Sequence, residues 1–224
     1  MAEYEIEVKS LLGDEAKADE LRAKLGRLNP PAAQHSSYTQ LNHYFEGGDP
    51  KKLVERLKDK LPGEIVEKMR QMAEGKNISV RTRAMNGEAR IVMKASIGDD
   101  SSENGVMRAE IEEPVKGLSL DALDEEVLAS GYQYQAKWSR SREEYRTEGM
   151  NICLDKNAGY GYLAEFEKVI ADAGGADAAR AEIDAFMKDI GCEELPQDRL
   201  ERMFAFYNEH WPEYYGTDKI FVID

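Results

Sequence analysis

The sequence contains few of the residues that form disulfides and soft-metal sites. Its 224 residues include only two cysteines and three histidines. Cys153 and Cys192 form no CxxC pair and have no metal-ligand spacing, so we expect ordinary thiols of a reducing compartment. His35, His43 and His210 show no ligand spacing either, and we expect them at the surface or in satisfied core positions.

Several signature motifs are also missing. There is no GxxxxGK[ST] phosphate loop, and Gly159-Tyr160-Gly161 is too short for a dinucleotide fingerprint. No GxSxG pattern or Cys/His arrangement suggests a covalent nucleophile. No apolar run is long enough to span a membrane and no signal peptide is visible, so we expect a cytoplasmic protein without a membrane partner.

Positive charge is the scarcer sign in this chain. Thirty Lys and Arg residues stand against 44 Asp and Glu, which gives a net charge of −14. This balance argues against nucleic acid or an anionic membrane as the main partner. The net charge does not exclude a small polyanionic ligand, because the binding of such a ligand depends on the local electrostatic field of its cleft. With 42% hydrophobic and 33% charged residues, the chain is typical of a globular protein with a proper core.

The most informative pattern is an alternation of charged and apolar residues at the start of the chain. In Glu5-Ile6-Glu7-Val8-Lys9, a strand would place all the charges on one face. A single stretch of this kind usually indicates a half-buried strand with its charges in water. The same alternation returns on later strands, however, and crowded like charges on one face are destabilising without counter-charges.

The periodicity predicts eight strands, mostly linked by hairpins, with helices between some of them. We expect strands at residues 5–9, 40–45, 78–83, 88–96, 107–115, 132–146, 151–156 and 163–169. We expect helices at residues 13–28, 51–75 with a break at Pro62-Gly63, 119–129, 178–191 and 196–210, and a short last strand at 219–223. A change of parity predicts a bulge or bend near Trp138. Lys137 has the opposite parity to Arg140 and Arg142, so we expect it to face outward unless the bulge moves it. The predicted fold class is α+β, with residues 1–170 as a barrel and 171–224 as a helical extension packed on it.

An eight-stranded antiparallel sheet can close into a barrel whose interior holds one small ligand. With the charged faces inward, the interior would collect carboxylates from Glu5, Glu7, Glu110, Glu112, Asp155, Glu165 and Glu167. It would collect cations from Lys9, Arg81, Arg83, Lys94, Arg108, Arg140 and Arg142. Unpaired buried charge is costly, so a divalent metal and a polyphosphate would complete such an interior. Oxygen-only ligands favour Mg²⁺ or Mn²⁺ over zinc, and forked guanidinium groups suit phosphate oxygens.

This pattern resembles a known family. Glu5-x-Glu7-x-Lys9 is similar to the ExExK signature of the CYTH, or triphosphate tunnel metalloenzyme, superfamily. The resemblance continues in order through Gln40-x-Asn42-x-Tyr44-Phe45, Val80-Arg81-Thr82-Arg83, Val92-Met93-Lys94, Arg108-x-Glu110-x-Glu112, Arg140-Ser141-Arg142-Glu143-Glu144-Tyr145, Ile152-Cys153-Leu154-Asp155 and Glu165-Phe166-Glu167. It covers roughly residues 3–170. Arg140 stands where the family usually has lysine, and Asn42 where it often has aspartate.

The resemblance implies an eight-stranded tunnel that binds a triphosphate with Mg²⁺ or Mn²⁺. By this resemblance the phosphates would be bound by Lys9, Arg81, Arg83, Lys94, Arg140 and Arg142, and Arg108 lies on the same predicted face. One or two metal ions would be held by Glu5, Glu7, Asp155, Glu165 and Glu167. We add Glu110 and Glu112 as metal ligands because of their predicted face. We expect the catalytic set to include Glu5, Glu7, Lys9, Arg140 and Arg142, and we leave the general base open among Glu5, Glu7 and Glu167.

Three functions follow from these expectations. The first is a metal-dependent triphosphatase acting on inorganic triphosphate, a nucleoside triphosphate or thiamine triphosphate. The second is a class IV adenylyl cyclase, which the same resemblance includes. The third is a non-catalytic polyphosphate or nucleotide sensor. The aromatic residues near the C-terminus would serve packing or an oligomer contact, which leaves a homodimer open.

Overall fold

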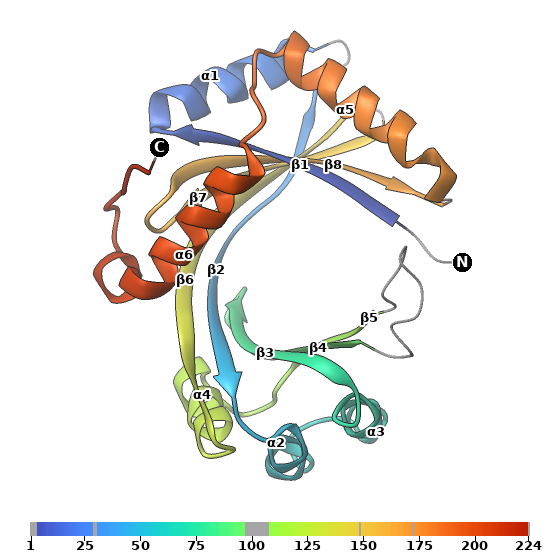
Figure 1. Ribbon diagram of the computed structural model, residues 1–224, viewed down its shortest axis with the longest axis vertical. Coiled ribbons are helices and arrows are strands. Elements are labelled where there is room, and N and C mark those ends of the chain that lie inside the picture. Colours follow the sequence, from blue (N-terminus) through green and yellow to red (C-terminus); the bar gives the residue numbers. More distant parts are fainter. Residues whose placement is uncertain (1–3, 29–30, 97–107, 148, 172, 224) are drawn as a thin grey trace. The chain divides into compact units, whose positions relative to one another are not determined.

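The protein is an α+β fold built on an eight-stranded antiparallel sheet (Figure 1). The computed structural model describes residues 4–28, 31–96, 108–147, 149–171 and 173–223. The strands are β1 (Tyr4–Gly13), β2 (Ala33–Gly47), β3 (Lys76–Met85), β4 (Glu88–Ser96), β5 (Arg108–Pro114), β6 (Tyr132–Thr147), β7 (Met150–Asn157) and β8 (Gly161–Ile170). The helices are α1 (Glu15–Gly26), α2 (Pro50–Leu57), α3 (Gly63–Met72), α4 (Leu120–Leu128), α5 (Ala176–Asp189) and α6 (Gln197–Tyr214), with a 3₁₀ turn η1 at Ala173–Gly175.

The strands are hydrogen bonded in the order β1-β8-β7-β6-β2-β3-β4-β5. The order begins at β1 and ends at β5, so in the described residues the hydrogen bonds form an open sheet. Closure into a barrel therefore stays a prediction. The eight predicted strands are confirmed, although β2 is much longer than the predicted residues 40–45, because the polar stretch before them also adopts strand conformation.

Helix boundaries follow local signals in the sequence. Pro62 separates α2 from α3, as predicted, because a proline inside a helix removes a backbone donor. Asp49 caps α2 by accepting a hydrogen bond from the backbone N–H of Lys51 at 2.9 Å. Ser119 caps α4 in the same way, through the N–H of Ala122 at 3.2 Å. The predicted loop at residues 98–105 and the predicted strand start at Met107 lie outside the described residues.

The chain groups into two compact units, each with its own core. Unit 1 comprises Met1–Thr39 and Ser139–Asp224, and unit 2 comprises Gln40–Trp138. In unit 1, helices α1 and α5 cover one face of the sheet formed by β1, β8 and β7 (Figure 1). Val8, Ile152 and Phe166 on that face are buried against apolar residues of the two helices. Burying a side chain of this size stabilises the fold by roughly 1.5–3 kcal/mol.

The C-terminal segment also belongs to unit 1. Phe221 is buried among the rings of Tyr160, Phe206 and Tyr214, with centroid distances of 4.9 to 5.3 Å. Its backbone N–H donates to the carbonyl of Gly159 at 2.8 Å. The predicted strand at residues 219–223 is wrong, because the segment forms one isolated bridge, from Ile220 to Gly159, and no ladder in the described residues. The aromatic residues here serve packing, as one of the predicted alternatives stated.

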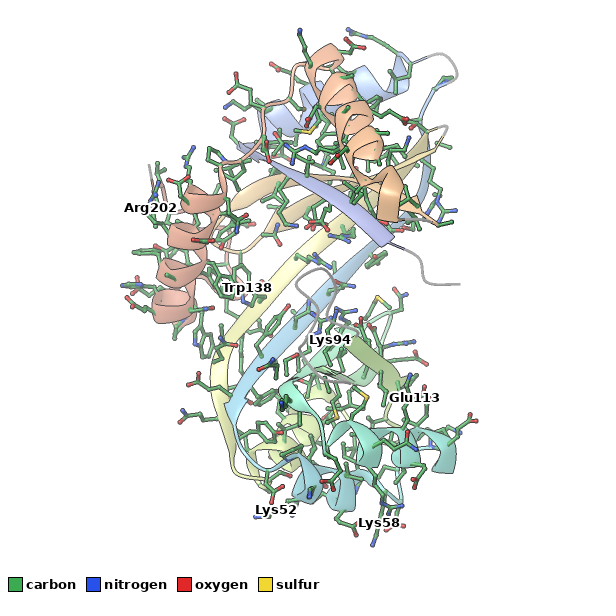
Figure 2. The ribbon with its side chains drawn as sticks, turned by 45° about the vertical axis from the view of Figure 1, so that its right-hand side comes forward. Lys52, Lys58, Lys94, Glu113, Trp138 and Arg202 are labelled. Atoms are coloured by element: carbon green, nitrogen blue, oxygen red, sulfur yellow. The ribbon has the colours of Figure 1, made fainter. Side chains whose placement is uncertain are left out.

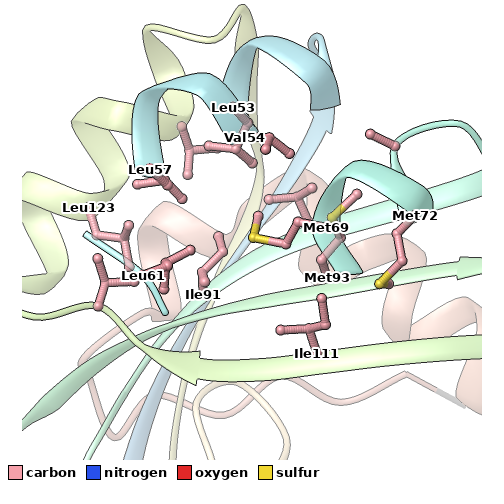
Figure 3. Packing of buried hydrophobic residues seen from close by; sticks show 14 of the residues in the cluster. Leu53, Val54, Leu57, Leu61, Met69, Met72, Ile91, Met93, Ile111 and Leu123 are labelled. Atoms are coloured by element: carbon pink, nitrogen blue, oxygen red, sulfur yellow. The ribbon is translucent and has the colours of Figure 1, made fainter. Parts of the chain in front are cut away.

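Unit 2 has a separate core between its strands and helices α2, α3 and α4. Figure 3 shows Leu53 and Leu57 of α2 and Met69 of α3 facing Ile91 and Met93 of β4. All five residues are fully buried. This packing uses one face of β3, β4 and β5, so the opposite face of these strands is left for polar residues.

A buried carboxylate joins α4 to the strands of unit 2. Asp124 is 1% exposed and accepts hydrogen bonds from Thr82 Oγ1 at 2.5 Å and Tyr134 OH at 2.7 Å, and it lies 2.6 Å from His43 Nδ1. Burial alone would raise the pKa of Asp124, but these three partners outweigh it and lower the pKa. His43 is thus a satisfied core histidine, as one predicted alternative stated.

Lys137 contacts the buried carboxylate of α4 on the helix-covered side of the unit 2 strands, which agrees with its predicted outward orientation. Its Nζ lies 3.8 Å from Asp124 and 4.1 Å from the ring centroid of Tyr134, and its side chain is 19% exposed. The buried residues of β6 change parity between Ala136 and Tyr145, which agrees with a change of face near Trp138. The Lys137 ammonium lies with Asp124 and Thr82, on the side opposite the face that carries Arg81 and Arg83.

Two further expectations concern the cysteines and membrane spans. Cys153 and Cys192 are both free thiols, and burial raises the pKa of Cys153 to about 12. Across the described ranges, none of the helices has both the length and the apolar character needed to cross a bilayer.

Candidate functional site

The register of the strands in unit 1 determines which side chains of the candidate site lie close together. Residues directly opposite each other in a sheet share a face. Arg142 lies opposite Asp155, and Glu165 lies opposite both Cys153 and Lys9. These residues occupy the face of the sheet away from α1 and α5, which we call the polar face of unit 1. The charged alternation of the sequence therefore places these predicted site residues together.

The tightest pair on this face is Arg142 with Asp155. Arg142 Nε donates to Asp155 Oδ1 at 2.7 Å and Nη2 donates to Oδ2 at 2.6 Å. Arg140 Nη1 adds a third hydrogen bond to Oδ2 at 3.0 Å. The Asp155 side chain is 1% exposed, so all its charge is compensated by these two guanidinium groups.

A second group of charges surrounds Glu165. Arg142 Nη2 donates to Glu165, Lys9 Nζ lies 3.5 Å from Glu165 Oε1, and Lys9 also contacts Glu7. Burial alone would raise the pKa of Glu165, but the charges of Arg142 and Lys9 outweigh it and lower the pKa. The carboxylate thus stays ionised and able to bind cations.

Two carboxylates face each other across β1 and β8. Glu7 on β1 lies directly opposite Glu167 on β8, and Glu7 also contacts Lys9. Like charges in this position repel, and a cation near both of them reduces the repulsion. Their oxygen donors match the chemistry of Mg²⁺ or Mn²⁺, so the residues present fit such an ion. In the described part of the chain, no group of three His, Cys, Asp or Glu side chains is arranged to hold a metal.

The polar face of unit 1 also includes residues to which the sequence analysis gave no role. Glu144 on β6 accepts hydrogen bonds from Tyr38 OH at 2.6 Å and Ser36 Oγ at 2.7 Å, and His35 Nε2 lies 3.3 Å from it. Burial, followed by the hydrogen bond to Glu144, raises the pKa of Tyr38 to about 12. The alternation of Ser36 and Tyr38 in the sequence could have indicated that β2 extends further towards the N-terminus and places these side chains on the polar face.

Unit 2 has a polar face of its own, on the side of β3, β4 and β5 away from the helices. Figure 2 shows Lys94 on this side, opposite Lys52 and Lys58 at α2. Lys94 Nζ lies 2.9 Å from Glu110 Oε2 and Arg81 Nη2 lies 3.7 Å from Glu110 Oε1. The predicted cations Arg81 and Lys94 and the predicted ligand Glu110 are therefore neighbours.

Arg83 completes this arrangement. Its Nη1 donates to Glu112 Oε2 at 2.6 Å and its Nε donates to Asn42 Oδ1 at 2.7 Å. Tyr44 lies next along β2, where its hydroxyl accepts a hydrogen bond from Arg81 Nη1 at 2.9 Å. Glu110 and Glu112, predicted as metal ligands, are thus paired with cations of unit 2.

Two predicted site residues are described only in their backbone. Glu5 lies opposite Val169 in β1–β8, and Arg108 lies opposite Ser96 in β4–β5. Their register is that of the polar faces, and their side chains lie outside the described parts of the structure.

Comparison with known proteins adds to this geometry. The sequence model of the CYTH domain matches residues 3–196, which is most of the chain and includes α5. A search among curated protein sequences finds no match.

Three solved structures of similar fold come from one bacterium and two archaea. A Vibrio parahaemolyticus protein described as a candidate adenylate cyclase has a TM-score of 0.57 at 11% identity, covering 92% of this chain and 99% of that chain. A conserved hypothetical protein from Pyrococcus furiosus has a TM-score of 0.55 at 17% identity, covering 85% of this chain and 92% of that chain. The PH1012 protein from Pyrococcus horikoshii has a TM-score of 0.54 at 16% identity, with the same coverage of each chain. At these identities the likeness establishes the fold alone.

Proposed function

The chain belongs to the CYTH domain family, and from this membership we propose that it is a divalent-metal-dependent triphosphatase that releases the terminal phosphate of a triphosphate. The observation that carries the proposal is the repeated pairing of cations with carboxylates on the polar face of each unit. A triphosphate supplies the anionic oxygens that the cations need, and a divalent ion supplies the charge that the carboxylates need. The proposed location is the cytoplasm.

The phosphate-binding role belongs to the arginines and lysines. Arg140 and Arg142 in unit 1, and Arg81, Arg83 and Lys94 in unit 2, would donate hydrogen bonds to phosphoryl oxygens. Because these groups are already held by neighbouring carboxylates, they are oriented before the substrate binds. Donors placed in this way stabilise charge that develops on the transferred phosphoryl group.

The metal-binding role would belong to Glu7 and Glu167, together with Glu5 and Glu165, which stand two residues earlier on the same strands. A metal ion held there would offset phosphate charge and acidify a bound water. Glu165 remains ionised at neutral pH, since its pKa is lowered, and Lys9 beside it would bind the same phosphate chain.

Hydrolysis is favoured over cyclisation by the character of the polar faces. A cyclase must also hold an adenine ring, which needs an apolar or aromatic surface. Tyr44 is the aromatic candidate on the unit 2 face, and the guanidinium of Arg81 already lies 5.5 Å from its ring centroid. Two residues near Tyr44 on this face, Arg83 and Asn42, are polar and suit phosphate better than a base.

The decisive experiment is a substrate panel. The full chain is incubated with Mg²⁺ or Mn²⁺ and with tripolyphosphate, ATP or thiamine triphosphate, and all products are resolved. We expect orthophosphate and the corresponding diphosphate. Cyclic AMP and pyrophosphate from ATP would instead identify an adenylyl cyclase, and tight binding without turnover in either metal would identify a sensor.

Variants connect the activity to the site. Glu5→Gln and Glu7→Gln should abolish turnover, because each removes a carboxylate proposed to hold the metal. Glu209→Gln, an exposed residue of α6, is the matched control and should retain wild-type activity. Wild-type turnover in Glu7→Gln would remove Glu7 from the metal site.

A further inference from the structure

Two arginines of unit 2 lie directly opposite each other on the polar face. Arg83 on β3 and Arg90 on β4 are cross-strand partners. Side chains in this position have Cβ atoms about 5 Å apart, and like charges there are destabilising. Arg83 has carboxylate and amide partners in Glu112 and Asn42. The sequence pattern gave Arg90 no role in phosphate binding, so this juxtaposition is new information from the register.

Arg90 is only partly neutralised. Its Nη2 donates to Glu88 Oε2 at 2.7 Å, and Glu88 is an exposed residue whose side chain is 53% accessible. An ion pair with so exposed a partner contributes little stability. Arg90 itself is 23% accessible, so its charge is less well hydrated than that of a surface arginine.

Two hydrogen-bond donors on the polar face of unit 2 have no acceptor among the described residues. The Nε atoms of Arg81 and Arg90 are both buried, and neither has a hydrogen-bond partner in the described residues. A buried donor without an acceptor costs roughly 1–3 kcal/mol, so native proteins usually supply one. Two such donors on one cationic face are the arrangement that an anion with several oxygens would satisfy.

We propose that Arg90 is a further substrate-binding residue, which acts with Arg83 on one phosphoryl group of the bound polyanion. This inference rests on the proposed function for the identity of the polyanion. Lys94 lies opposite Ser79, two residues from Arg81 on β3, and Arg81 is in turn two residues from Arg83. With a rise of about 3.4 Å per residue, the cations of unit 2 form a row that ends at the Arg83–Arg90 pair.

The row gives Arg90 a specific role in recognition. Cations at its Lys94 end and at its Arg83–Arg90 end both favour phosphoryl groups. A sugar or base placed at the Arg83–Arg90 pair would leave the Nε donor of Arg90 without an acceptor. Arg90 should therefore contribute most to a substrate whose phosphate reaches that pair, and tripolyphosphate is the simplest probe.

The test is a direct measurement of binding without turnover. Tripolyphosphate is titrated calorimetrically into the full chain in the presence of EDTA, for the wild type, Arg90→Gln and Glu88→Gln. We expect Arg90→Gln to weaken binding about tenfold, the effect of losing one charge-assisted hydrogen bond. Arg90→Lys should recover part of the loss, because an ammonium keeps the charge but lacks the fork.

Glu88→Gln is the matched control, because it breaks the same ion pair from the other side. If Arg90 serves only that pair, the two variants should bind alike. If Arg90 binds the substrate, Glu88→Gln should bind as well as the wild type or more tightly. In steady-state kinetics, Arg90→Gln should raise KM about tenfold and change kcat less than about twofold.

The outcomes separate this inference from the proposed function. Equal affinities for the wild type and Arg90→Gln would overturn the role of Arg90, and so would a wild type that does not bind tripolyphosphate. Binding that depends on Arg90 in a protein without turnover would support Arg90 and refute the triphosphatase.

Discussion

Arg142 binds both carboxylate oxygens of Asp155, with Nε 2.7 Å from Oδ1 and Nη2 2.6 Å from Oδ2. The resemblance to the family assigned Asp155 to metal binding and Arg142 to phosphate binding. In the structure the two residues neutralise each other, and Arg140 reinforces the pair. For Asp155 to reach a metal ion, the guanidinium of Arg142 must turn towards another anion. The substrate triphosphate could provide it.

The first prediction concerns the stability of this pair. Arg142→Gln should lower the free energy of unfolding by about 3 kcal/mol, because it leaves the buried Asp155 carboxylate with only Arg140 as a partner. Urea denaturation followed by circular dichroism measures the change. Arg202→Gln, which breaks an exposed ion pair with Asp198 on α6, should cost less than about 0.5 kcal/mol. Equal losses in the two variants would contradict the buried character of the Asp155 pair.

The second prediction concerns pH. Hydrogen bonds from Arg22 lower the pKa of Glu143 despite partial burial. A carboxylate whose pKa is lower in the folded state stabilises the protein above its unfolded pKa of about 4.3, and that stability is lost as the pH falls. The free energy of unfolding should therefore decline from about pH 5 to pH 3, and less steeply in Glu143→Gln. Arg22→Gln should flatten the profile in the same way, and an unchanged slope in both variants would refute the linkage.

The third prediction concerns the buried carboxylate of unit 2. Asp124→Asn should lower the free energy of unfolding by about 2–4 kcal/mol, because an amide cannot accept the hydrogen bonds of Thr82 and Tyr134 and also satisfy its own donors. Thermal unfolding measures the effect. Glu125→Gln, the exposed neighbour on α4, should stay within about 0.5 kcal/mol of the wild type. A wild-type melting temperature in Asp124→Asn would show that the network does not stabilise the unit.

The fourth prediction separates backbone strain from steric overlap. Gly161 and Gly87 both have positive φ, at +71° and +80°. A Cβ on Gly161 would lie 2.0 Å from the carbonyl oxygen of Gly13, whereas a Cβ on Gly87 would meet nothing within 4 Å. Gly87→Ala should cost about 1 kcal/mol and Gly161→Ala at least about 3 kcal/mol in urea denaturation. Similar costs would mean that the approach of β1 to Gly161 relaxes easily.

Much of the fold was predictable because strands and helices leave different periods in a sequence. Glu7 and Lys9 alternate with Val8, and that period of two fixed which side chains share the polar face. The Pro62 break and the caps at Asp49 and Ser119 depend only on local backbone chemistry. The predicted strand at residues 219–223 failed because a strand also needs a partner, and Gly159 provides only one bridge.

The sequence predicted which face of the sheet each site residue occupies, but not which residues on that face contact one another. The parity of Arg81 and Arg83 placed them on one face, yet the sequence could not show that Arg90 lies opposite Arg83, because register depends on the neighbouring strand. Asp124 was missed for a similar reason. Its acidic neighbours on α4 made it indistinguishable from a solvated residue until the folded strands placed His43 and Thr82 around it.

The contact between the α5–α6 connection and β1 bears on how the protein behaves in solution. The backbone N–H of Leu195 donates to the carbonyl of Lys9 at 2.7 Å, on the strand that begins the sheet order. Terminal strands offer unpaired backbone groups on which other chains can assemble into fibrils or aggregates. By occupying one such group with its own C-terminal segment, the molecule makes its first strand a poorer template for that assembly.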